Sequence, residues 1–464
     1  MLPDPMDVGS SVKSASRETD ALLPKPTDTG TRSADASLTT GQLLQLSSAM
    51  AAIQFSYATE FAFGTPYFRL RNVSYSVLPL IWLAGPFSGF LVQPLVGHWS
   101  DRVGRRWPFI ALGALFIIGG MALMASADWA GRTLFGDVCA PGPRCHATVA
   151  LATVGLWVLN AAINVMQGPA RALVGDLAPV SQQTQANSTI TLLMGAANLA
   201  GNLLVTFSRG GIQQVLVVGM AVVALTAWPT VRAARALGDG RLARRRPSAG
   251  DGDEDEEEGA VIAPVLFDLM ESIGAMYPIA LPYFFSWLAF TPFQFYTTDW
   301  FGSDVYRQAG EYEKGVRMGA LSFAAFSVVQ VLFSIVQPAA ARRGVRRLYA
   351  ASQFSLGAVA LLVWWLGRRV SPAMAMTLVA SLGINFTVFN AIPFALIATH
   401  LPPDTRGATM ALLNASCVIA QTLGNALVGV VTAAAGGVVS VGIGCIAVLS
   451  TLACLLFIPR MPSM

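Results

Sequence analysis

The chain has 464 residues, of which 54% are hydrophobic and only 12% are charged. A soluble globular protein contains roughly a quarter charged residues, so this composition excludes an ordinary soluble domain and favours a membrane protein. The formal net charge of +4 comes mainly from arginines in predicted loops. It therefore bears on membrane orientation, and we do not expect nucleic-acid binding.

The chain opens with a polar stretch, residues 1–45, which has no apolar segment typical of a signal peptide and is expected to be a disordered tail. Apolar blocks of about twenty residues follow, each long enough as a helix to cross roughly 30 Å of hydrocarbon. They predict twelve membrane-spanning helices at residues 46–68, 78–99, 109–127, 147–166, 190–207, 212–231, 277–295, 316–339, 348–366, 373–399, 408–431 and 438–458.

A polar stretch, residues 232–262, separates the first six blocks from the last six. It is basic first and acidic at 253–258, which is typical of a solvated linker. We therefore predict one half at 46–231, another at 263–458, and a short tail at 459–464. The largest Lys and Arg clusters all fall on the side of the N-terminus, so the positive-inside rule predicts cytoplasmic termini and a cytoplasmic linker.

The two halves share sequence patterns. GPARALVGDLAP has prolines at 169 and 179, and IPFALIATHLPP has prolines at 393 and 403, the same spacing apart. The Thr65-Pro66 step of the first block is likewise echoed by Thr291-Pro292 in the seventh. Echoes in the same order indicate an internal duplication, which predicts an all-α membrane protein built from two parallel six-helix halves.

The loop after the second block carries the most specific motif, GHWSDRVGRR from Gly97. It matches the major facilitator signature G-x-x-x-D-R-x-G-R-R, and with the following WPFI it resembles the sucrose-type proton symporters, closest to their animal and fungal relatives. IWLAGPFSGFLVQPLVG from Ile81, QGPARAL from Gln167 and TPFQFYTTDWFGSDVY from Thr291 extend the resemblance over nearly the whole chain. The resemblance implies the major facilitator fold and proton-coupled sugar transport.

Charged residues at the helix ends are candidate gating residues. Asp101 can lie near a helix N-terminus and pair with Arg102 or Arg105, which would form a latch on the cytoplasmic side. A short basic loop that only obeys the positive-inside rule is the alternative.

Three further charges extend this gating set. Asp176 lies five residues after Arg171 and could pair with it. Asp299 and Arg317, at the predicted outer ends of the seventh and eighth helices, could form an outer gate or could be rim charges.

The coupling site is expected at a buried carboxylate. In plant sucrose symporters the fourth helix carries an aspartate held to bind the proton, and this chain has Asn160 there. Glu60 is the acidic residue that lies well inside an apolar block, and the animal relatives carry a glutamate in a similar segment. Because a carboxylate in hydrocarbon is costly, Glu60 should face a cavity and bind the coupling proton. A structural carboxylate bonded to a neighbouring helix is the alternative.

The substrate site is expected to be neutral, because sugars are uncharged and hydroxyl-rich. Asn160, Asn164 and Gln167 follow i, i+4, i+7 and so share one helical face. Arg171 matches an arginine that is functionally important in the family, although it could be a positive-inside anchor. The candidate substrate-binding residues are Tyr57, Gln93, Asn160, Asn164, Gln167 and Arg171. Trp82 and Trp157 are further candidates for stacking on a sugar.

Other polar residues in the apolar blocks have more than one interpretation. Asn198 with Asn202, and Gln421 with Asn425, form amide stripes that favour packing between helices. The cysteines at 139 and 145 flank a Pro-Gly-Pro loop and could form a disulfide if that loop faces an oxidising compartment.

We therefore expect a monomeric secondary transporter in a lipid bilayer, with a sugar substrate (sucrose, another disaccharide, a glucoside or a hexose) and the proton as coupling ion. No other cofactor and no enzymatic activity are expected. A carrier for another small organic solute, or a transport-inactive sensor or scaffold, are the alternatives. Glu18 followed by Leu22-Leu23 spells an acidic dileucine sorting pattern, so an endosomal or vacuolar membrane is considered beside the plasma membrane.

Overall fold

The computed structural model describes residues 37–137, 145–179, 182–209, 211–242, 262–400 and 406–462. The predicted N-terminal tail, apart from its last residues, and the acidic run at 253–258 lie outside these ranges. Within them, all regular structure is helical. The first group of helices is α2 (Thr40–Arg69), α3 (Leu78–Trp82), α4 (Ala84–Val103), α5 (Trp107–Phe135), α6 (His146–Leu177), α7 (Gln183–Phe207) and α8 (Gly211–Leu242).

The second group is α9 (Ile262–Trp300), α10 (Tyr312–Ala341), α11 (Val345–Leu366), α12 (Pro372–His400), α13 (Arg406–Ala434) and α14 (Val439–Phe457). A π-helical turn, η2 (Phe301–Val305), extends α9, and the short 3-10 turns η3 (Gly367–Arg369) and η4 (Ile458–Arg460) follow α11 and α14.

Ten described segments are long and apolar enough to cross a membrane, with α3 and α4 counting as one. The other two long helices, α2 and α9, carry more polar or proline residues; α2 packs against α6, α7 and α8, and α9 packs against α13 and α14. The described residues thus contain twelve long helical segments, as predicted, and the predicted all-α class is confirmed.

The helices are longer than the apolar blocks that predicted them. α6 was expected at 147–166 and runs to Leu177, and α8 was expected to end at 231 and runs to Leu242. The first part of the stretch predicted as linker is therefore helical. Ala, Leu and Arg, which are strong helix formers, make up residues 232–237, and adding a residue to an existing helix is far easier than starting one. The domain boundaries as such stay a prediction.

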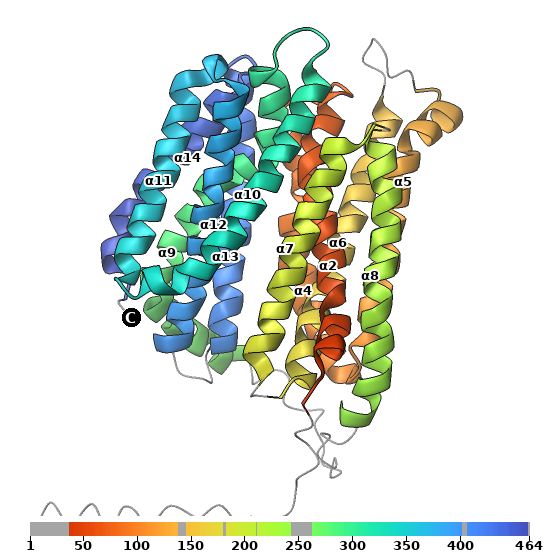
Figure 1. The fold of residues 1–464 in the computed structure, drawn as a ribbon, viewed down its shortest axis with the longest axis vertical. Helices are drawn as coiled ribbons and strands as arrows, with labels where there is room; N and C mark the ends of the chain where they lie inside the picture. Colours follow the sequence, from red (N-terminus) through yellow and green to blue (C-terminus); the bar gives the residue numbers. More distant parts are fainter. Residues whose placement is uncertain are drawn as a thin grey trace, which may run out of the picture.

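The two groups stand side by side in Figure 1, with α2 to α8 on one side and α9 to α14 on the other. They meet where α2 packs against α9, α7 against α10, and α3 and α4 against α13. α5, α8, α11 and α14 lie away from this junction. The space between the groups is therefore bounded by the helices that carry most of the predicted site residues.

Small residues let the helices within a group approach closely. A Cβ atom on Gly120 of α5 would lie 2.8 Å from the backbone oxygen of Gly155 on α6, and one on Gly113 would lie 2.7 Å from the Met166 Cβ. Such distances are too short for any side chain. Close backbone contact at small residues is the usual way in which helices pack in a membrane, where lipid removes the hydrophobic drive between them.

The two ends of the bundle differ in charge. One end holds the start of α2, the α4–α5 junction with Arg105 and Arg106, the end of α6, and the α10–α11 junction with Arg342 and Arg343. We call it the basic end. The other, called the opposite end, holds the α2–α3 loop, the end of α5 and the start of α10.

Cys145, at the opposite end, is disulfide-bonded. Cys417, Cys445 and Cys454 are free, and the predicted partner, Cys139, lies outside the described residues. The same turn is also held by a carboxylate, because Asp137 Oδ2 accepts a hydrogen bond from the Thr148 backbone N–H at 2.6 Å.

Removing the disulfide should lower stability moderately. A bridge to the predicted partner Cys139 would close a loop of only a few residues. By limiting the conformations of the unfolded chain, such a bridge contributes about 2 kcal/mol to the free energy of unfolding. Cys145→Ser should therefore lower the melting temperature of the detergent-solubilised protein by a few degrees. The free Cys445 provides a matched control, since Cys445→Ser removes a thiol without removing a bridge. Equal melting temperatures for wild type and Cys145→Ser would contradict the prediction.

Candidate functional site

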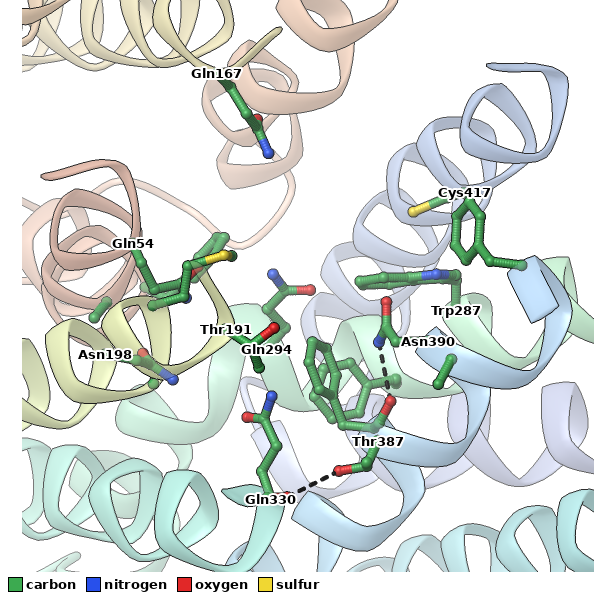
Figure 2. A pocket seen from close by; sticks show the side chains of 18 of the residues that line it. Gln54, Gln167, Thr191, Asn198, Trp287, Gln294, Gln330, Thr387, Asn390 and Cys417 are labelled. Carbon is green, nitrogen blue, oxygen red and sulfur yellow. Dashed lines mark hydrogen bonds between the residues drawn. The ribbon is translucent and has the colours of Figure 1, made fainter. Parts of the chain in front are cut away.

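A large cavity lies between the two groups of helices in the described part of the chain, with a volume of about 1320 Å³. α2, α4, α6 and α7 line it from one side, and α9, α10, α12 and α13 line it from the other. Figure 2 shows side chains from both groups projecting into the space between them. The cavity is larger than most small-molecule sites, which are usually about 300–1,000 Å³.

The walls of the cavity are amides and aromatic rings. The amide side chains are Gln54, Gln93, Gln167, Asn198, Asn202, Gln294, Gln330, Gln337 and Asn390. The rings, apart from Phe61 and Phe90, come from the second group: Tyr283, Trp287, Phe290, Phe323, Phe326, Phe386 and Phe394. Among the described lining residues, Arg171 alone carries a permanent charge. Neutral donors and acceptors beside aromatic faces suit an uncharged, hydroxyl-bearing solute.

The cavity opens toward the basic end. Gln337, four residues before the end of α10, and Arg171, near the end of α6, both line it. Toward the opposite end the two groups are bonded together. The Thr65 hydroxyl on α2 donates to the Phe295 backbone oxygen on α9 at 2.6 Å, and the Trp82 indole N–H donates to the Thr65 oxygen at 3.0 Å.

Aromatic rings reinforce this closure. Phe295 makes edge contacts with Phe61 and Trp82, with ring centroids 5.3 and 4.6 Å apart, and Tyr57 stacks on Phe61 at 5.7 Å. Because Phe61 also lines the cavity, this cluster forms its closed inner wall. Trp82 is therefore part of the closure and not a surface that a sugar can stack on.

A buried carboxylate joins the two groups closer still to the opposite end. Asp299 on α9 is fully buried and accepts hydrogen bonds from the hydroxyls of Tyr75 at 2.8 Å and Tyr312 at 2.6 Å. Tyr75 belongs to the α2–α3 loop of the first group, and the Arg69 guanidinium lies 3.8 Å from the centre of its ring. Asp299 is thus in the position expected of an outer gate. Arg317 is partly buried, and no hydrogen bond or ion pair of its side chain is found among the described residues.

Asp304 is a second fully buried carboxylate that sequence reasoning did not single out. It accepts a hydrogen bond from the Ser440 backbone N–H at 2.7 Å and lies 3.4 Å from the Arg368 Nε. Both partners belong to the second group, so Asp304 links η2 to η3 and to the start of α14. Its sequence position near the end of a helix concealed this burial.

The predicted substrate residues divide into two sets. Gln93, Gln167 and Arg171 line the cavity, and the Gln93 amide N–H donates to the Gln167 amide oxygen at 3.2 Å. Tyr57 does not line it, although it lies within electrostatic range of Arg171. Trp157 also lies away from the cavity, against Phe87 at 5.7 Å.

Asn160 and Asn164 share the helical face of Gln167, as predicted, but they do not line the cavity in this conformation. α4 covers that part of the face at two glycines, because a Cβ on Gly85 would lie 3.0 Å from the Asn160 amide oxygen. Asn164 donates to the Ser88 hydroxyl on α4 at 2.9 Å. The prediction that both asparagines face the substrate is therefore wrong for this state, because α4 approaches α6 closely at Gly85 and Gly89.

Glu60 meets Asn160, the residue that replaces the plant aspartate. The Asn160 amide N–H donates to Glu60 Oε1 at 2.7 Å, while Glu60 Oε2 is buried without a hydrogen-bond partner among the described residues. The expectation that Glu60 faces the large cavity is wrong here. Gln54, Ala58 and Phe61 are the α2 residues on the cavity side, and Glu60 instead borders a void of about 10 Å³ toward α5, α6 and α8.

An ion pair at the basic end involves Asp176, one of the predicted gating residues. Asp176 accepts a hydrogen bond from Arg106 Nε at 3.1 Å, and Arg106 also donates to the Ser100 hydroxyl at 2.6 Å. The predicted pairing of Asp176 with Arg171 is wrong, because residues five apart on a helix lie about 140° apart around its axis. The side chains of Asp101 and Arg102 lie outside the described residues, and that of Arg105 is exposed.

The amide stripes behave partly as predicted. Asn198 donates to Ser327 on α10 at 2.9 Å, and Asn425 accepts from the Tyr296 hydroxyl at 2.9 Å, so both join helices. Asn198 and Asn202 also line the cavity. Sequence reasoning missed the whole second-group wall, although two glutamines in apolar blocks, Gln294 and Gln330, were a visible signal.

Comparison with known proteins agrees with this geometry. The chain is 29% identical over 431 residues to the sucrose transport protein SUC4 of Arabidopsis thaliana, covering 82% of each chain. It is 26% identical over 436 residues to the sucrose transport protein SUT2 of Oryza sativa subsp. japonica, covering 82% of this chain and 85% of the relative. The family described as PUCC protein matches residues 76–255.

Solved structures share the fold. A D-xylose-proton symporter superposes with a TM-score of 0.63 at 13% identity, covering 90% of this chain and 98% of that one. The nucleoside transporter NupG superposes with a TM-score of 0.64 at 13% identity, with the same coverages. The chain is thus similar to sucrose transport proteins over most of its length, and it shares its fold, the major facilitator fold, with these solved transporters.

Proposed function

We propose that this protein transports a saccharide across a membrane by alternating access, with a disaccharide or glucoside as its substrate and the proton as its coupling ion. The observation that carries the proposal is the cavity between the two helix groups, whose described wall is made of neutral amides and aromatic rings. Its relatives are named as sucrose transport proteins. No carboxylate in the described wall offers a partner to a cationic solute.

The proposed coupling site is the Glu60–Asn160 pair. Its carboxylate is held by one hydrogen bond across α2 and α6, and its other oxygen has no partner, so a proton can be bound there without breaking an existing bond. Protonation would neutralise the charge and reduce the cost of closing the site in a dry environment. Since Phe61 is the next residue on α2 and lines the cavity, movement of α2 connects the pair to the substrate.

The proposed orientation has the basic end and both termini in the cytoplasm of a plasma, endosomal or vacuolar membrane, with a monomer as the working unit. The arginines gathered at the basic end support this orientation, because positively charged loops favour the cytoplasmic side. The disulfide at the opposite end also supports it, because disulfides persist in oxidising compartments. In this orientation the conformation described here is open to the cytoplasm.

Uptake into proteoliposomes tests the proposal. We expect the purified protein to accumulate at least one labelled disaccharide or glucoside when a pH gradient is imposed, and a protonophore should abolish the accumulation. Ala391→Trp is the control, because a large ring at this lining position narrows the cavity, while the Glu60–Asn160 pair does not line it. Absence of saccharide uptake and of saccharide counterflow in the wild type would contradict the function.

A further inference from the structure

Gln294 and Gln330 line the cavity from the second group, and their side chains make no hydrogen bond among the described residues. Gln294 on α9 is mostly buried, and its Oε1 atom is fully occluded and unpaired. Gln330 on α10 is partly buried, and its side-chain amide makes no hydrogen bond among the described residues; only its backbone oxygen accepts one, from Thr387 at 3.4 Å.

Unpaired buried amides are uncommon because they cost free energy. Most buried polar atoms have a partner, and leaving one unpaired costs about 1–3 kcal/mol. In this chain the neighbouring amides are paired, since Asn198 bonds to Ser327 and Asn390 donates to the Phe386 backbone oxygen at 3.0 Å. Gln54 and Gln337 also line the cavity without a side-chain hydrogen bond among the described residues. Gln294 and Gln330 are thus two of the lining glutamines whose hydrogen-bonding capacity is left for a ligand, and Gln294 has an occluded oxygen besides.

The two amides converge from different helices. Figure 2 shows Gln294 and Gln330 pointing into the same part of the cavity, with Thr191 of the first group drawn between them. The last torsion of a glutamine side chain is soft, so the occluded Gln294 oxygen can turn toward a ligand at little cost. Aromatic residues surround this region: Phe290 and Phe326 stack with ring centroids 5.9 Å apart, and both line the cavity.

This polar pair is separate from the predicted substrate residues. Gln93, Gln167 and Arg171 lie on α4 and α6, in the first group, while Gln294 and Gln330 lie on α9 and α10, in the second. Figure 2 shows Gln167 and Gln330 on opposite sides of the space between the groups. A solute of two linked rings can contact both polar sets at once, whereas a single ring can contact only one.

We propose that Gln294 and Gln330 form a second sugar-binding subsite, which holds the second ring of a disaccharide or glycoside and thereby selects such substrates over free hexoses. The inference rests on the proposed function of saccharide transport. The amide oxygens accept hydrogen bonds from ring hydroxyls, the amide N–H groups donate to them, and the adjacent Phe290 and Phe326 rings contact the apolar faces of the sugar.

Transport kinetics of matched variants test the subsite. The variants are Gln294→Leu and Gln330→Leu, which remove the amide and keep a similar size, assayed in proteoliposomes with the disaccharide that the wild type transports best and with glucose. Each variant should raise the KM for the disaccharide about 5- to 10-fold with little change in maximal rate, because a hydrogen bond contributes about 1 kcal/mol. The KM for glucose should change less than twofold.

A conservative variant and a matched control separate binding from folding. Gln294→Glu keeps an acceptor oxygen and should retain more disaccharide affinity than Gln294→Leu. Gln353→Leu removes a buried glutamine that is also unpaired but lies on α11 away from the cavity, and it should leave both KM values unchanged. The melting temperature of each variant, with and without the disaccharide, shows whether it is folded and binds.

The outcomes distinguish the subsite from the function. If the wild type transports a disaccharide and Gln294→Leu and Gln330→Leu leave its KM unchanged, the subsite is wrong and the function stands. Equal KM increases for disaccharide and glucose would also overturn the proposed selection. If the wild type transports no saccharide at all, the function itself fails.

Discussion

Glu60→Gln should abolish pH-driven accumulation of the substrate and leave counterflow exchange near the wild-type rate. Glutamine has the size of a protonated glutamate, and it can keep the contact with the Asn160 amide, which lies 2.7 Å from the carboxylate. It cannot release a proton, so the transporter would be fixed in its neutral form. Proteoliposomes provide both measurements, with an imposed pH gradient for accumulation and preloaded unlabelled sugar for exchange.

The double variant Glu60→Gln with Asn160→Asp sharpens this test. It moves the carboxylate to the other member of the pair, where the plant symporters carry their aspartate, and it keeps an acid facing an amide across the same contact. We expect pH-driven accumulation to return at least in part. A loss of accumulation and exchange to the same extent in Glu60→Gln would instead favour a structural role for this carboxylate.

Tyr75→Phe should shift the protein toward the state that is open at the opposite end, and Tyr312→Phe should not. Each substitution removes one of the two hydroxyls that donate to Asp299. Asp299 and Tyr312 belong to the second helix group and Tyr75 belongs to the first. Only the loss of the Tyr75 hydroxyl therefore removes a hydrogen bond between the two groups. A hydrogen bond to a carboxylate contributes about 1.5–3 kcal/mol, which corresponds to roughly a tenfold or larger change in the population of the open state.

The native Cys417 reports this shift, because it lines the cavity and is a free thiol. An impermeant thiol reagent applied from the side of the opposite end should label Cys417 at least several-fold faster in Tyr75→Phe than in the wild type. Cys417→Ser identifies the background labelling. Equal labelling of Tyr75→Phe and Tyr312→Phe would show that the cross-group bond does not control access.

The gating residues Asp299 and Asp176 show what a sequence can and cannot predict. Asp299 was predicted at an outer gate from its place at a helix end, and the structure places it between tyrosines of both groups. Asp176 was also predicted as a gating residue, but with the wrong partner, because Arg106 reaches it from the α4–α5 junction. A helix position indicates which end of the membrane a charge occupies, but not which neighbouring helix provides its partner.

The substrate residues show the same limit. Gln167 was correctly placed by its amide stripe, yet Asn160 and Asn164 on the same stripe are covered by α4, which approaches at Gly85 and Gly89. Gln294 and Gln330 belong to separate helices whose spacing in the sequence gives no sign that they meet. Periodicity assigns residues to one face of a helix, while the packing of the neighbouring helix decides which part of that face stays open.

By itself, the sequence determined the membrane environment, the helical class, the number of spanning segments and the resemblance to sucrose-type carriers. These follow from local properties, since an apolar block of sufficient length has no stable alternative to a helix in hydrocarbon. The tertiary structure alone decided that Glu60 is bonded to Asn160 away from the cavity, and that the cavity opens at the basic end. Those features depend on contacts between residues far apart in the chain, which only the packed bundle brings together.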